Sequence, residues 1–344
     1  MPDFSIRLIA WQKIHGRHDL PWQNTRDPYA IWVSEIMLQQ TQVTAVIPYF
    51  QRFMLRFPDI VSLAATEQEE VLQRWSGLGY YSRARNLHSA AQMIVDEHGG
   101  QFPHDFETML SLPGIGHSTA AAVASLAFGQ HQAILDGNVK RVLARHFLLE
   151  GWPGLPRVEK QLWALAQELL PQADMEAYTQ GLMDLGATLC ARSKPRCSEC
   201  PLNQTCLAYQ QQRVNELPVP KPRKASPQKH TTMLILLKGN EVMLEKRPPS
   251  GIWGGLWSLP EINAGESPEQ VVELRYGLQA ECQPVLKALT HSFTHFRLRI
   301  QPQPMQVLME KPQAREAGLI WLALNDAIGA ALPTPVRNIL LSLK

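Results

Sequence analysis

Apolar residues in the first two thirds of the chain recur three or four positions apart. The clearest cases are Val71–Trp75, Ala84–Val95 and Thr119–Phe128. This spacing places apolar side chains on one face of a helix and polar side chains on the other. The pattern therefore predicts a mostly α-helical region over residues 1–217.

The pattern changes in the last third of the chain. Short apolar runs separated by turn-rich pieces predict strands at Thr231–Leu237, Glu241–Glu245 and Phe296–Gln301. The periodicity of Thr334–Leu343 predicts a closing helix. We expect a small α+β domain over residues 230–344.

The two regions are separated by Leu217–Lys229, which reads LPVPKPRKASPQK. Four prolines and the lack of an apolar period predict a semi-rigid linker, which we place at residues 218–229. A length of 344 residues suits two or three domains rather than one. No apolar stretch is typical of a membrane span, so we expect a soluble protein with no membrane partner.

Four of the five cysteines lie within 17 residues, in the order C-x6-C-x2-C-x5-C; they are Cys190, Cys197, Cys200 and Cys206. Four thiolates at such spacings suit a 4Fe–4S cluster or a tetrahedral zinc ion. Zinc modules more often use two C-x2-C pairs, and only one pair occurs here, so we favour iron and sulfur. Free thiols and the lack of a signal peptide indicate a cytoplasmic location.

The formal net charge of +2 hides a local excess of positive charge. Residues 190–229 contain eight Lys or Arg against two Glu. The basic residues are Arg192, Lys194, Arg196, Arg213, Lys221, Arg223, Lys224 and Lys229. Such a patch suits contact with nucleic-acid phosphates, although by itself it is more typical of a solvated charged loop.

A glycine-containing turn, LPGIG at Leu112–Gly116, lies between two predicted helices. Gly114 and Gly116 allow positive φ and the close approach of a phosphate, and the next helix presents unpaired N–H groups to it. The element fits a hairpin that holds a DNA backbone without reading its sequence. A plain helix–helix turn is the alternative.

Two carboxylates are candidates for acid–base chemistry. Glu35 is the only charged residue between Asp27 and Arg52, in a predicted helix that is apolar on nearly every face. Burial can raise a carboxyl pKa by up to ~3–5 units, which would make Glu35 a general acid at neutral pH. Asp136 precedes Gly-Asn at a predicted helix start. The alternatives are a structural glutamate and an N-cap aspartate worth ~1 kcal/mol.

Several longer motifs carry a family resemblance. They are LPWQ at Leu20–Gln23, WVSEIMLQQTQV at Trp32–Val43, GLGYYSRARNL at Gly77–Leu87, LPGIGHSTA at Leu112–Ala120 and LDGNVKRVLAR at Leu135–Arg145. With the downstream cysteines, they resemble the helix-hairpin-helix superfamily of base-excision DNA glycosylases that carry a 4Fe–4S cluster. Within it, the sequence is similar to the MutY-type adenine DNA glycosylases. The resemblance implies a mostly α N-terminal glycosylase region with a six-helix barrel, a helical iron–sulfur region formed by the N-terminus and residues 136–217, and a Nudix-like α+β C-terminal domain.

The resemblance also implies catalytic roles. In that family the residue matching Glu35 protonates adenine at N7, which makes the base a leaving group. The residue matching Asp136 stabilises the oxocarbenium-like sugar, as carboxylates do in glycoside hydrolysis, and Asn138 helps to position the sugar and water. In strand-nicking relatives a lysine just after the hairpin forms a Schiff base. Ser118 stands at that position here, which implies a monofunctional glycosylase, and Lys140 is expected to be a surface cation near phosphate.

An adenine must leave the duplex before it can react, so protein side chains must fill the gap. The residues matching the family's DNA contacts are Trp22, Gln39, Gln40, Thr41, Leu78, Tyr80 and Gln180. By this resemblance Gln40 and Tyr80 are wedges beside the opposing lesion, and Thr41 and Leu78 line it. By the same resemblance, Trp22 and Gln180 help to form the adenine pocket. Core packing is the alternative for Trp22 and Leu78.

The C-terminal region resembles the Nudix-like domain with which these glycosylases sense 8-oxoguanine. A Nudix hydrolase needs a glutamate-rich helix for its divalent metal, but the matching stretch, ESPEQVVELRYGL, lacks the REx2EE pattern. We therefore expect recognition rather than hydrolysis. Phe293, Thr294 and His295 match the family's lesion-sensing Phe-Ser-His loop, with Thr294 in place of serine.

We thus expect a monomeric, monofunctional glycosylase with a 4Fe–4S cluster that removes adenine opposite 8-oxoguanine or guanine from double-stranded DNA. Three other functions stay open on the sequence alone. They are an endonuclease III-like lyase, a nonenzymatic iron–sulfur or zinc DNA-binding module, and a nucleotide pyrophosphatase. The lyase would need a Schiff-base lysine, and the pyrophosphatase would need the missing glutamate helix.

Overall fold

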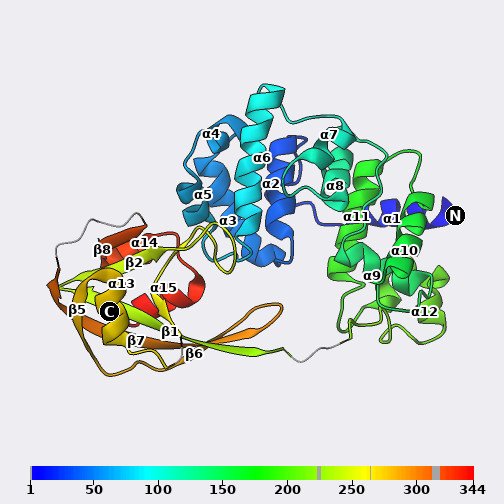
Figure 1. The fold of residues 1–344 in the computed structure, drawn as a ribbon. Coiled ribbons are helices and arrows are strands. Elements are labelled where there is room, and N and C mark those ends of the chain that lie inside the picture. The colour runs from blue at the N-terminus through cyan, green and yellow to red at the C-terminus, as the bar shows by residue number, and fades with distance from the viewer. Residues whose placement is uncertain (1, 223–225, 264, 312–317) are drawn as a thin grey trace. The chain divides into compact units, whose positions relative to one another are not determined.

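The computed structural model describes residues 2–222, 226–263, 265–311 and 318–344. Residues 223–225, within the predicted linker, lie outside this described part. The chain forms two compact units, which are Met1–Ala65 with Asn86–Arg223 and Thr66–Arg85 with Lys224–Lys344. Figure 1 shows the helices of the first unit and the sheet of the second. The predicted domain limits at residues 217 and 230 stay predictions.

The first unit is helical, as the sequence predicted. Its helices are α1 (Pro2–His15), α2 (Pro28–Leu38), α3 (Val43–Arg56), α4 (Ile60–Ala64), α6 (Ser82–His98), α7 (Phe106–Ser111), α8 (His117–Phe128), α9 (Gly137–His146), α10 (Pro156–Glu168), α11 (Met175–Thr188) and α12 (Leu207–Gln210), with 3-10 turns at Cys197–Glu199 and Asn203–Thr205. Helix α6 begins in the second unit and continues into the first. No described helix has the length and apolar character that crossing a bilayer requires.

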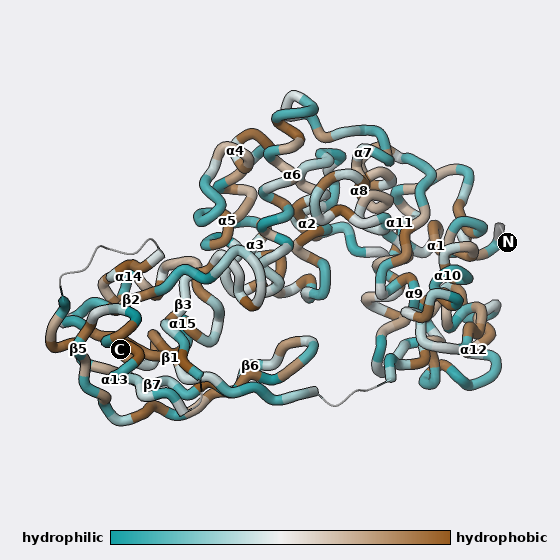
Figure 2. Tube along the Cα trace, in the orientation of Figure 1, coloured by the Kyte–Doolittle hydropathy of each residue, from teal (hydrophilic) through white to brown (hydrophobic). Residues whose placement is uncertain are grey.

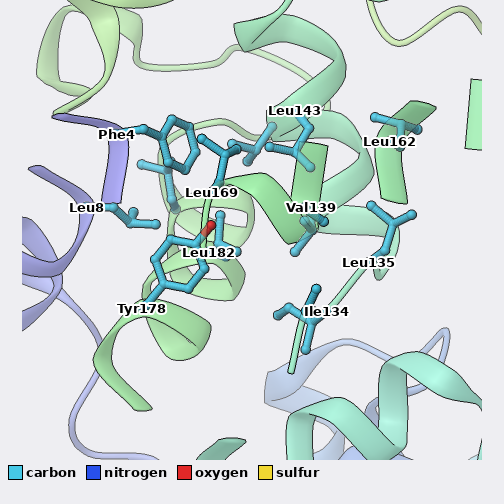
Figure 3. Close-up of a cluster of buried hydrophobic side chains, with 14 of the residues drawn as sticks. Phe4, Leu8, Ile134, Leu135, Val139, Leu143, Leu162, Leu169, Tyr178 and Leu182 are labelled. Atoms are coloured by element: carbon cyan, nitrogen blue, oxygen red, sulfur yellow. The ribbon is translucent and has the colours of Figure 1, made fainter. Parts of the chain in front are cut away.

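Helix α11 packs against α1, α8 and α9, and α2 packs against α3 and α8. Figure 3 shows the core that holds α1, α9, α10 and α11 together, where Leu8 and Leu182 gather with Val139, Leu143 and Leu162. Val139 and Leu143 stand four positions apart, so α9 turns one apolar face to this core. This packing fixes α9 and α11, which carry several candidate site residues.

Helix α2 begins at a strong capping signal. Asp27 is its N-cap and accepts hydrogen bonds from the backbone N–H groups of Tyr29 at 3.0 Å and Ala30 at 3.4 Å. Pro28 follows at the first helical position, where its fixed φ suits a helix. Eight of the eleven residues of α2 are buried, and Figure 2 shows hydrophobic positions along it. Glu35 is therefore carried by an almost wholly apolar helix.

The predicted hairpin Leu112–Gly116 joins α7 to α8. Gly114 has a φ of 79°, and a Cβ there would lie 2.7 Å from the Asn86 Cβ, so only glycine fits. Gly116 is the N-cap of α8, and a Cβ there would meet nothing within 4 Å. The space beside Gly116 at the start of α8 is therefore open.

The second unit contains an eight-stranded sheet among its described residues. The strands are β1 (Gln228–Lys238), β2 (Glu241–Lys246), β3 (Trp257–Ser258), β4 (Glu261–Ile262), β5 (Leu278–Cys282), β6 (Leu289–Ser292), β7 (Arg297–Glu310) and β8 (Leu319–Ala323). The order is β3-β2-β1-β7-β5, and β4 also pairs with β1, β8 with β2 and β6 with β7. Strands β1 and β7 run parallel, and the other pairs are antiparallel.

One face of this sheet forms a core in which Leu234 and Leu236 of β1 gather with Met305 of β7 and Val272 of α13 (Pro268–Tyr276). Helices α5 (Gln68–Trp75), α14 (Leu324–Gly329) and α15 (Thr334–Leu341) belong to the same unit. The sequence predicted β1, β2, the start of β7 and α15. It did not predict the remaining strands, because runs of two to five residues carry too few alternating positions.

Candidate active site

Glu35 lies at the wall of two adjoining cavities in the first unit. The first cavity, of about 560 Å³, is lined by Glu35 together with Trp22 and Gln180. The second, of about 400 Å³, is lined by Glu35 together with Asp136 and Asn138. The two carboxylates that the sequence singled out, far apart along the chain, therefore face one cavity.

The surroundings of Glu35 favour the protonated carboxyl. Burial, followed by the negative charge of Asp136, raises the pKa of Glu35 from 4.5 to about 7. No hydrogen bond from the described residues offsets these two effects. Glu35 can therefore hold a proton near neutral pH and give it to a group bound in either cavity.

Asp136 is the N-cap of α9, as one interpretation of the sequence predicted. Its carboxylate accepts hydrogen bonds from the Val139 backbone N–H at 2.8 Å and from Asn138 Nδ2 at 3.2 Å. Burial raises the pKa of Asp136 above its usual value, and these hydrogen bonds and the charge of Arg141 only partly offset that rise. Asp136 thus has hydrogen-bond donors that stabilise its anion, whereas the described residues donate no hydrogen bond to Glu35. The two carboxyls therefore differ in how well their anions are stabilised.

Arg141 fixes the orientation of Asn138. Its Nη2 donates to Asn138 Oδ1 at 2.8 Å and to the Gly186 carbonyl at 2.6 Å, and its Nε donates to the Cys190 carbonyl at 2.8 Å. Hydrogen bonds therefore run without a break from Asp136 through Asn138 and Arg141 to the backbone of the first cysteine.

A buried carboxylate, Asp184, holds two residues that line the first cavity, Arg17 and Gln180. The Asp184 carboxylate is fully buried and accepts hydrogen bonds from Gln180 Nε2 at 2.8 Å, the Arg17 backbone N–H at 2.8 Å and the Arg17 guanidinium at 2.7 Å. Gln180 is thereby held in place by the residue one turn along α11. Trp22 is 7% exposed and packs edge-on against Phe50, with ring centroids 5.3 Å apart. Trp22 therefore packs in the core and also lines the cavity.

Gln39, Gln40 and Thr41 follow the last turn of α2 and line the second cavity. Gln39 Nε2 donates to Thr119 Oγ1 at 3.3 Å. Gln40 is exposed and has a φ of 57°. A left-handed backbone is uncommon outside glycine and is concentrated at functional sites. The chain thus presents Gln40 at the mouth of the cavity in a conformation that costs free energy.

Two further predicted contact residues already have partners. Ser118 lines the second cavity, and its hydroxyl accepts a hydrogen bond from the Leu135 backbone N–H at 2.7 Å. Lys140 Nζ lies 2.6 Å from Glu159 Oε1. The charge of Lys140 is therefore balanced within the protein.

The predicted basic patch is partly compensated as well. Arg196 pairs with Glu199, and Arg213 pairs with Glu150 and Glu216. Lys221 lies over the Trp152 ring and Lys229 over the Phe296 ring. Arg223 and Lys224 lie outside the described residues. This arrangement agrees with a solvated charged surface for the paired residues.

In the second unit, Leu78 and Tyr80 lie on the turn between α5 and α6. Gly77 and Gly79 have φ of 108° and 75°, and Tyr80 also has a positive φ, 48°. Leu78 is buried, whereas Tyr80 is 47% exposed. Tyr80 Oη lies 3.3 Å from Thr294 Oγ1. The turn therefore displays the tyrosine and keeps the leucine in the core.

Phe293, Thr294 and His295 form the loop between β6 and β7. Thr294 and His295 are exposed, but Phe293 is half-buried. Its ring stacks on Phe296 with centroids 4.6 Å apart and contacts Trp253 at 5.4 Å. Phe293 therefore anchors the loop that displays the two polar residues.

The four clustered cysteines line one pocket in the first unit, together with Arg145. Arg145 is 2% exposed and donates to the Cys190 carbonyl at 3.3 Å and to its sulfur at 3.4 Å. Burial, with a contribution from the charges of the other thiolates, raises the pKa of Cys200 to about 12. Among the described residues no group of three or more His, Cys, Asp or Glu is arranged to hold a single metal ion.

Comparison with known proteins decides the family. Residues 33–168 match the HhH-GPD superfamily of base excision DNA repair proteins, and residues 231–342 match the NUDIX domain. The adenine DNA glycosylase of Buchnera aphidicola subsp. Acyrthosiphon pisum is 38% identical over 99% of this chain and 97% of its own length. The chain belongs to the adenine DNA glycosylase family. The human adenine DNA glycosylase is 34% identical, over 98% of this chain and 73% of its own length.

A solved structure supports the fold of this adenine DNA glycosylase. A thermostable thymine-DNA glycosylase is 32% identical, with a TM-score of 0.55, over 60% of this chain and 95% of its own length. The predicted fold class, a helical glycosylase region followed by a Nudix-like domain, is confirmed. The enzyme class is confirmed too, as a DNA glycosylase of base excision repair whose partner is DNA.

Several residues that contact the candidate site residues were not predicted from the sequence. They are Arg17, Arg141, Arg145 and Asp184. Local spacing could have indicated two of them, because Asp184 follows Gln180 by four positions and Arg141 follows Asn138 by three. The Arg17–Asp184 pair joins residues 167 positions apart and leaves no local pattern.

Proposed function

We propose that this glycosylase removes adenine paired with 8-oxoguanine or guanine in duplex DNA, acting as a monomer by acid-assisted hydrolysis of the N-glycosidic bond. The observation that carries the proposal is that Glu35 and Asp136 line one cavity, and that hydrogen-bond donors stabilise the Asp136 anion while burial raises the pKa of Glu35 to about 7. Such a pair supplies a proton to a leaving base and a negative charge to the sugar that it leaves.

Glu35 is the general acid. Its carboxyl proton goes to N7 of an adenine held in the first cavity, and the electrons of the glycosidic bond then leave with the neutral base. Trp22 and Gln180 form the walls of that cavity. Glu35 lines both cavities, so its carboxyl can act on a base in the first cavity and on the sugar side in the second.

Asp136 is the carboxylate that stabilises the oxocarbenium-like sugar in the second cavity. Asn138, fixed by Arg141, positions the sugar and the attacking water. Water adds to the anomeric carbon and its proton returns to Glu35, which restores the acid. Fixed charges of this kind lower the barrier because they need no rearrangement as positive charge develops.

Ser118 supports a monofunctional reaction. A lyase needs an amine that attacks the anomeric carbon, and the side chain on this part of the cavity wall is a hydroxyl bound to the Leu135 N–H. Gly114 and Gly116 of the hairpin would hold the DNA backbone near the same cavity, because the space beside Gly116 is open.

Gln40 of the first unit and Tyr80 of the second are the wedges that enter the base stack. Thr41 and Leu78 line the lesion, and Gln39 is a further DNA contact. Both wedges are exposed and both have positive φ. Strain of this kind persists only where surrounding structure imposes it. It therefore supports a role in which each side chain is held ready for insertion.

Thr294 and His295 read the 8-oxoguanine, and Phe293 anchors their loop. A further cavity in the Nudix-like domain is lined by Glu245 and Glu261. Hydrolysis there is not favoured, because both carboxylates already have partners. Glu245 pairs with Arg275 and accepts a hydrogen bond from Tyr276, and Glu261 pairs with Arg247 at 2.6 Å. These ion pairs support recognition rather than metal-dependent cleavage of a nucleotide.

Cys190, Cys197, Cys200 and Cys206 would hold the 4Fe–4S cluster. A cluster takes one thiolate at each of four irons, and the four thiols line a common pocket. The cluster would supply a structural cross-link. Iron and zinc analysis of the purified protein tests the assignment, and one zinc per chain after expression with ample iron would contradict it.

One assay tests the function. The protein is incubated with a duplex that contains a single A opposite 8-oxoguanine, and alkali is then added. We expect cleavage at the A after alkali and little without it, and no cleavage of the matched A:T duplex. Efficient cleavage without alkali, together with borohydride trapping, would favour a lyase. Binding without any base release would favour a nonenzymatic module.

A further inference from the structure

The segment Thr66–Arg85 precedes the C-terminal region by more than a hundred residues but folds as part of the same unit. One of its attachments is Glu69 on α5. The Glu69 carboxylate accepts hydrogen bonds from the Lys246 ammonium and the Trp257 indole N–H. Partial burial acts to raise the pKa of Glu69, but these two contacts outweigh it and lower the pKa below its usual value. The interaction thus favours the ionised carboxylate.

A second attachment is centred on Ser76, at the end of α5. The Ser76 hydroxyl donates to the Leu332 carbonyl at 2.8 Å and accepts from Arg337 Nη2 at 2.9 Å. The same Leu332 carbonyl accepts from Tyr81 Oη at 3.3 Å. The three contacts hold both sides of the turn that carries Tyr80.

A third attachment reaches the aromatic base of the loop between β6 and β7. Arg85 Nη1 donates to the Gly254 carbonyl at 2.7 Å. The neighbouring Trp253 packs against Phe293, which anchors the loop. At the tip, Tyr80 Oη lies 3.3 Å from Thr294 Oγ1. The turn and the loop are therefore joined both at their bases and at their tips.

We propose that Thr66–Arg85 is a docking segment of the Nudix-like domain, and that Glu69 and Ser76 are positioning residues that hold Tyr80 against Thr294. The inference deepens the proposed function, because the effect that it predicts on the preference for 8-oxoguanine rests on that function. A tyrosine wedge and a threonine that reads the lesion then form one preorganised surface rather than two independent contacts. Preorganised contacts lose less conformational entropy on binding.

The test uses full-length Ser76→Ala and Glu69→Gln variants. Single-turnover excision is measured on A:8-oxoguanine and A:G duplexes. We expect the preference for 8-oxoguanine to fall by roughly threefold to tenfold in each variant, with less than a twofold change on A:G. The matched controls are Ser342→Ala and Glu310→Gln, which remove a hydroxyl and a charge elsewhere in the same unit. The controls should keep the wild-type preference.

A double-mutant cycle with Tyr80→Phe identifies the route of the effect. If Ser76 acts by holding the Tyr80 hydroxyl, then Ser76→Ala should cause no further loss in the Tyr80→Phe background. Fully additive losses would overturn the positioning role.

Amide hydrogen exchange over residues 76–81 separates this inference from the proposed function. We expect faster exchange in Ser76→Ala than in wild type or Ser342→Ala. Unchanged exchange with unchanged preference would overturn the docking. If the wild type itself showed no preference for 8-oxoguanine, the proposed specificity would fail, while the exchange result would still decide whether the segment is docked.

Discussion

At the scale of single residues, Glu35 and Asp136 are chemically similar groups in different surroundings. Glu35 lies on an apolar helix, and burial together with the charge of Asp136 raises its pKa. Asp136 has two donors within its own helix start, Val139 and Asn138. The donors at Asp136 stabilise its anion, so the pair can supply an acid and an anion to one cavity.

Asp136→Asn is predicted to separate the catalytic role of this residue from its capping role. Asparagine caps a helix about as well as aspartate, within ~1 kcal/mol, but it has no negative charge for the sugar. Single-turnover adenine excision should fall by ~10²–10³-fold, and the thermal midpoint should change little. Asp59→Asn, at the N-cap of α4, is the matched control and should keep the wild-type rate. A wild-type rate in Asp136→Asn would contradict the role.

A single residue could be predicted as functional where it departs from the ordinary pattern of its neighbours. A lone carboxyl in an apolar run is costly, so Glu35 stood out. An aspartate before Gly-Asn is common as a helix cap. A catalytic role for Asp136 is supported only by the cavity that it shares with Glu35. The pairing of Asp184 with Arg17 could not be predicted, because the partner of this fully buried aspartate on α11 comes from a different part of the chain.

At the scale of elements, the hairpin and α8 determine which chemistry the cavity permits. Helix α8 begins at His117, directly after its N-cap Gly116. Ser118 therefore lies in the first turn and lines the cavity. The helix itself was predictable from its apolar period. The hydrogen bond from Leu135 to Ser118 was not, because it joins the helix to a loop 17 residues later.

Ser118→Lys is predicted to give some strand-nicking activity. The change places an amine on the wall of the sugar cavity and leaves the Leu135 N–H without its acceptor, so we also expect a loss of stability of ~1–3 kcal/mol. Borohydride should trap a covalent complex with the A:8-oxoguanine duplex. Ser111→Lys, at the end of α7, adds the same charge outside the cavity and should trap none. Failure of Ser118→Lys to form any adduct would show that Ser118 does not decide the subclass.

At the scale of the whole molecule, the change from helical to strand periodicity predicted the two regions, and the boundary in the proline-rich stretch stays a prediction. The sequence did not predict that Thr66–Arg85 joins the C-terminal unit. Helix α5 has an ordinary amphipathic pattern, and such a pattern does not specify which surface its apolar face covers. Removal of the C-terminal domain would also remove the partners of Ser76 and Tyr81, so point variants test lesion recognition more cleanly.

Thr294→Val is predicted to weaken the preference for 8-oxoguanine over guanine by roughly tenfold, because it removes a hydrogen-bonding hydroxyl worth about 1–3 kcal/mol and keeps the shape. The measurement is single-turnover excision of A opposite each base. Thr290→Val, on the exposed part of β6, is the matched control. An unchanged preference in Thr294→Val would place lesion recognition elsewhere.

The most direct test of the account is the pH dependence of adenine excision in wild type and Glu35→Gln. The acid must be protonated, and a carboxyl loses its proton as the pH rises through its pKa, which burial raises to about 7 for Glu35. The wild-type single-turnover rate should therefore fall tenfold per pH unit well above pH ~7. Glu35→Gln should bind the duplex nearly normally but lose ~10²–10⁴-fold in rate at every pH. A wild-type rate that stays constant from about pH 6 to 9, or a Glu35→Gln variant that excises adenine at the wild-type rate, would contradict it.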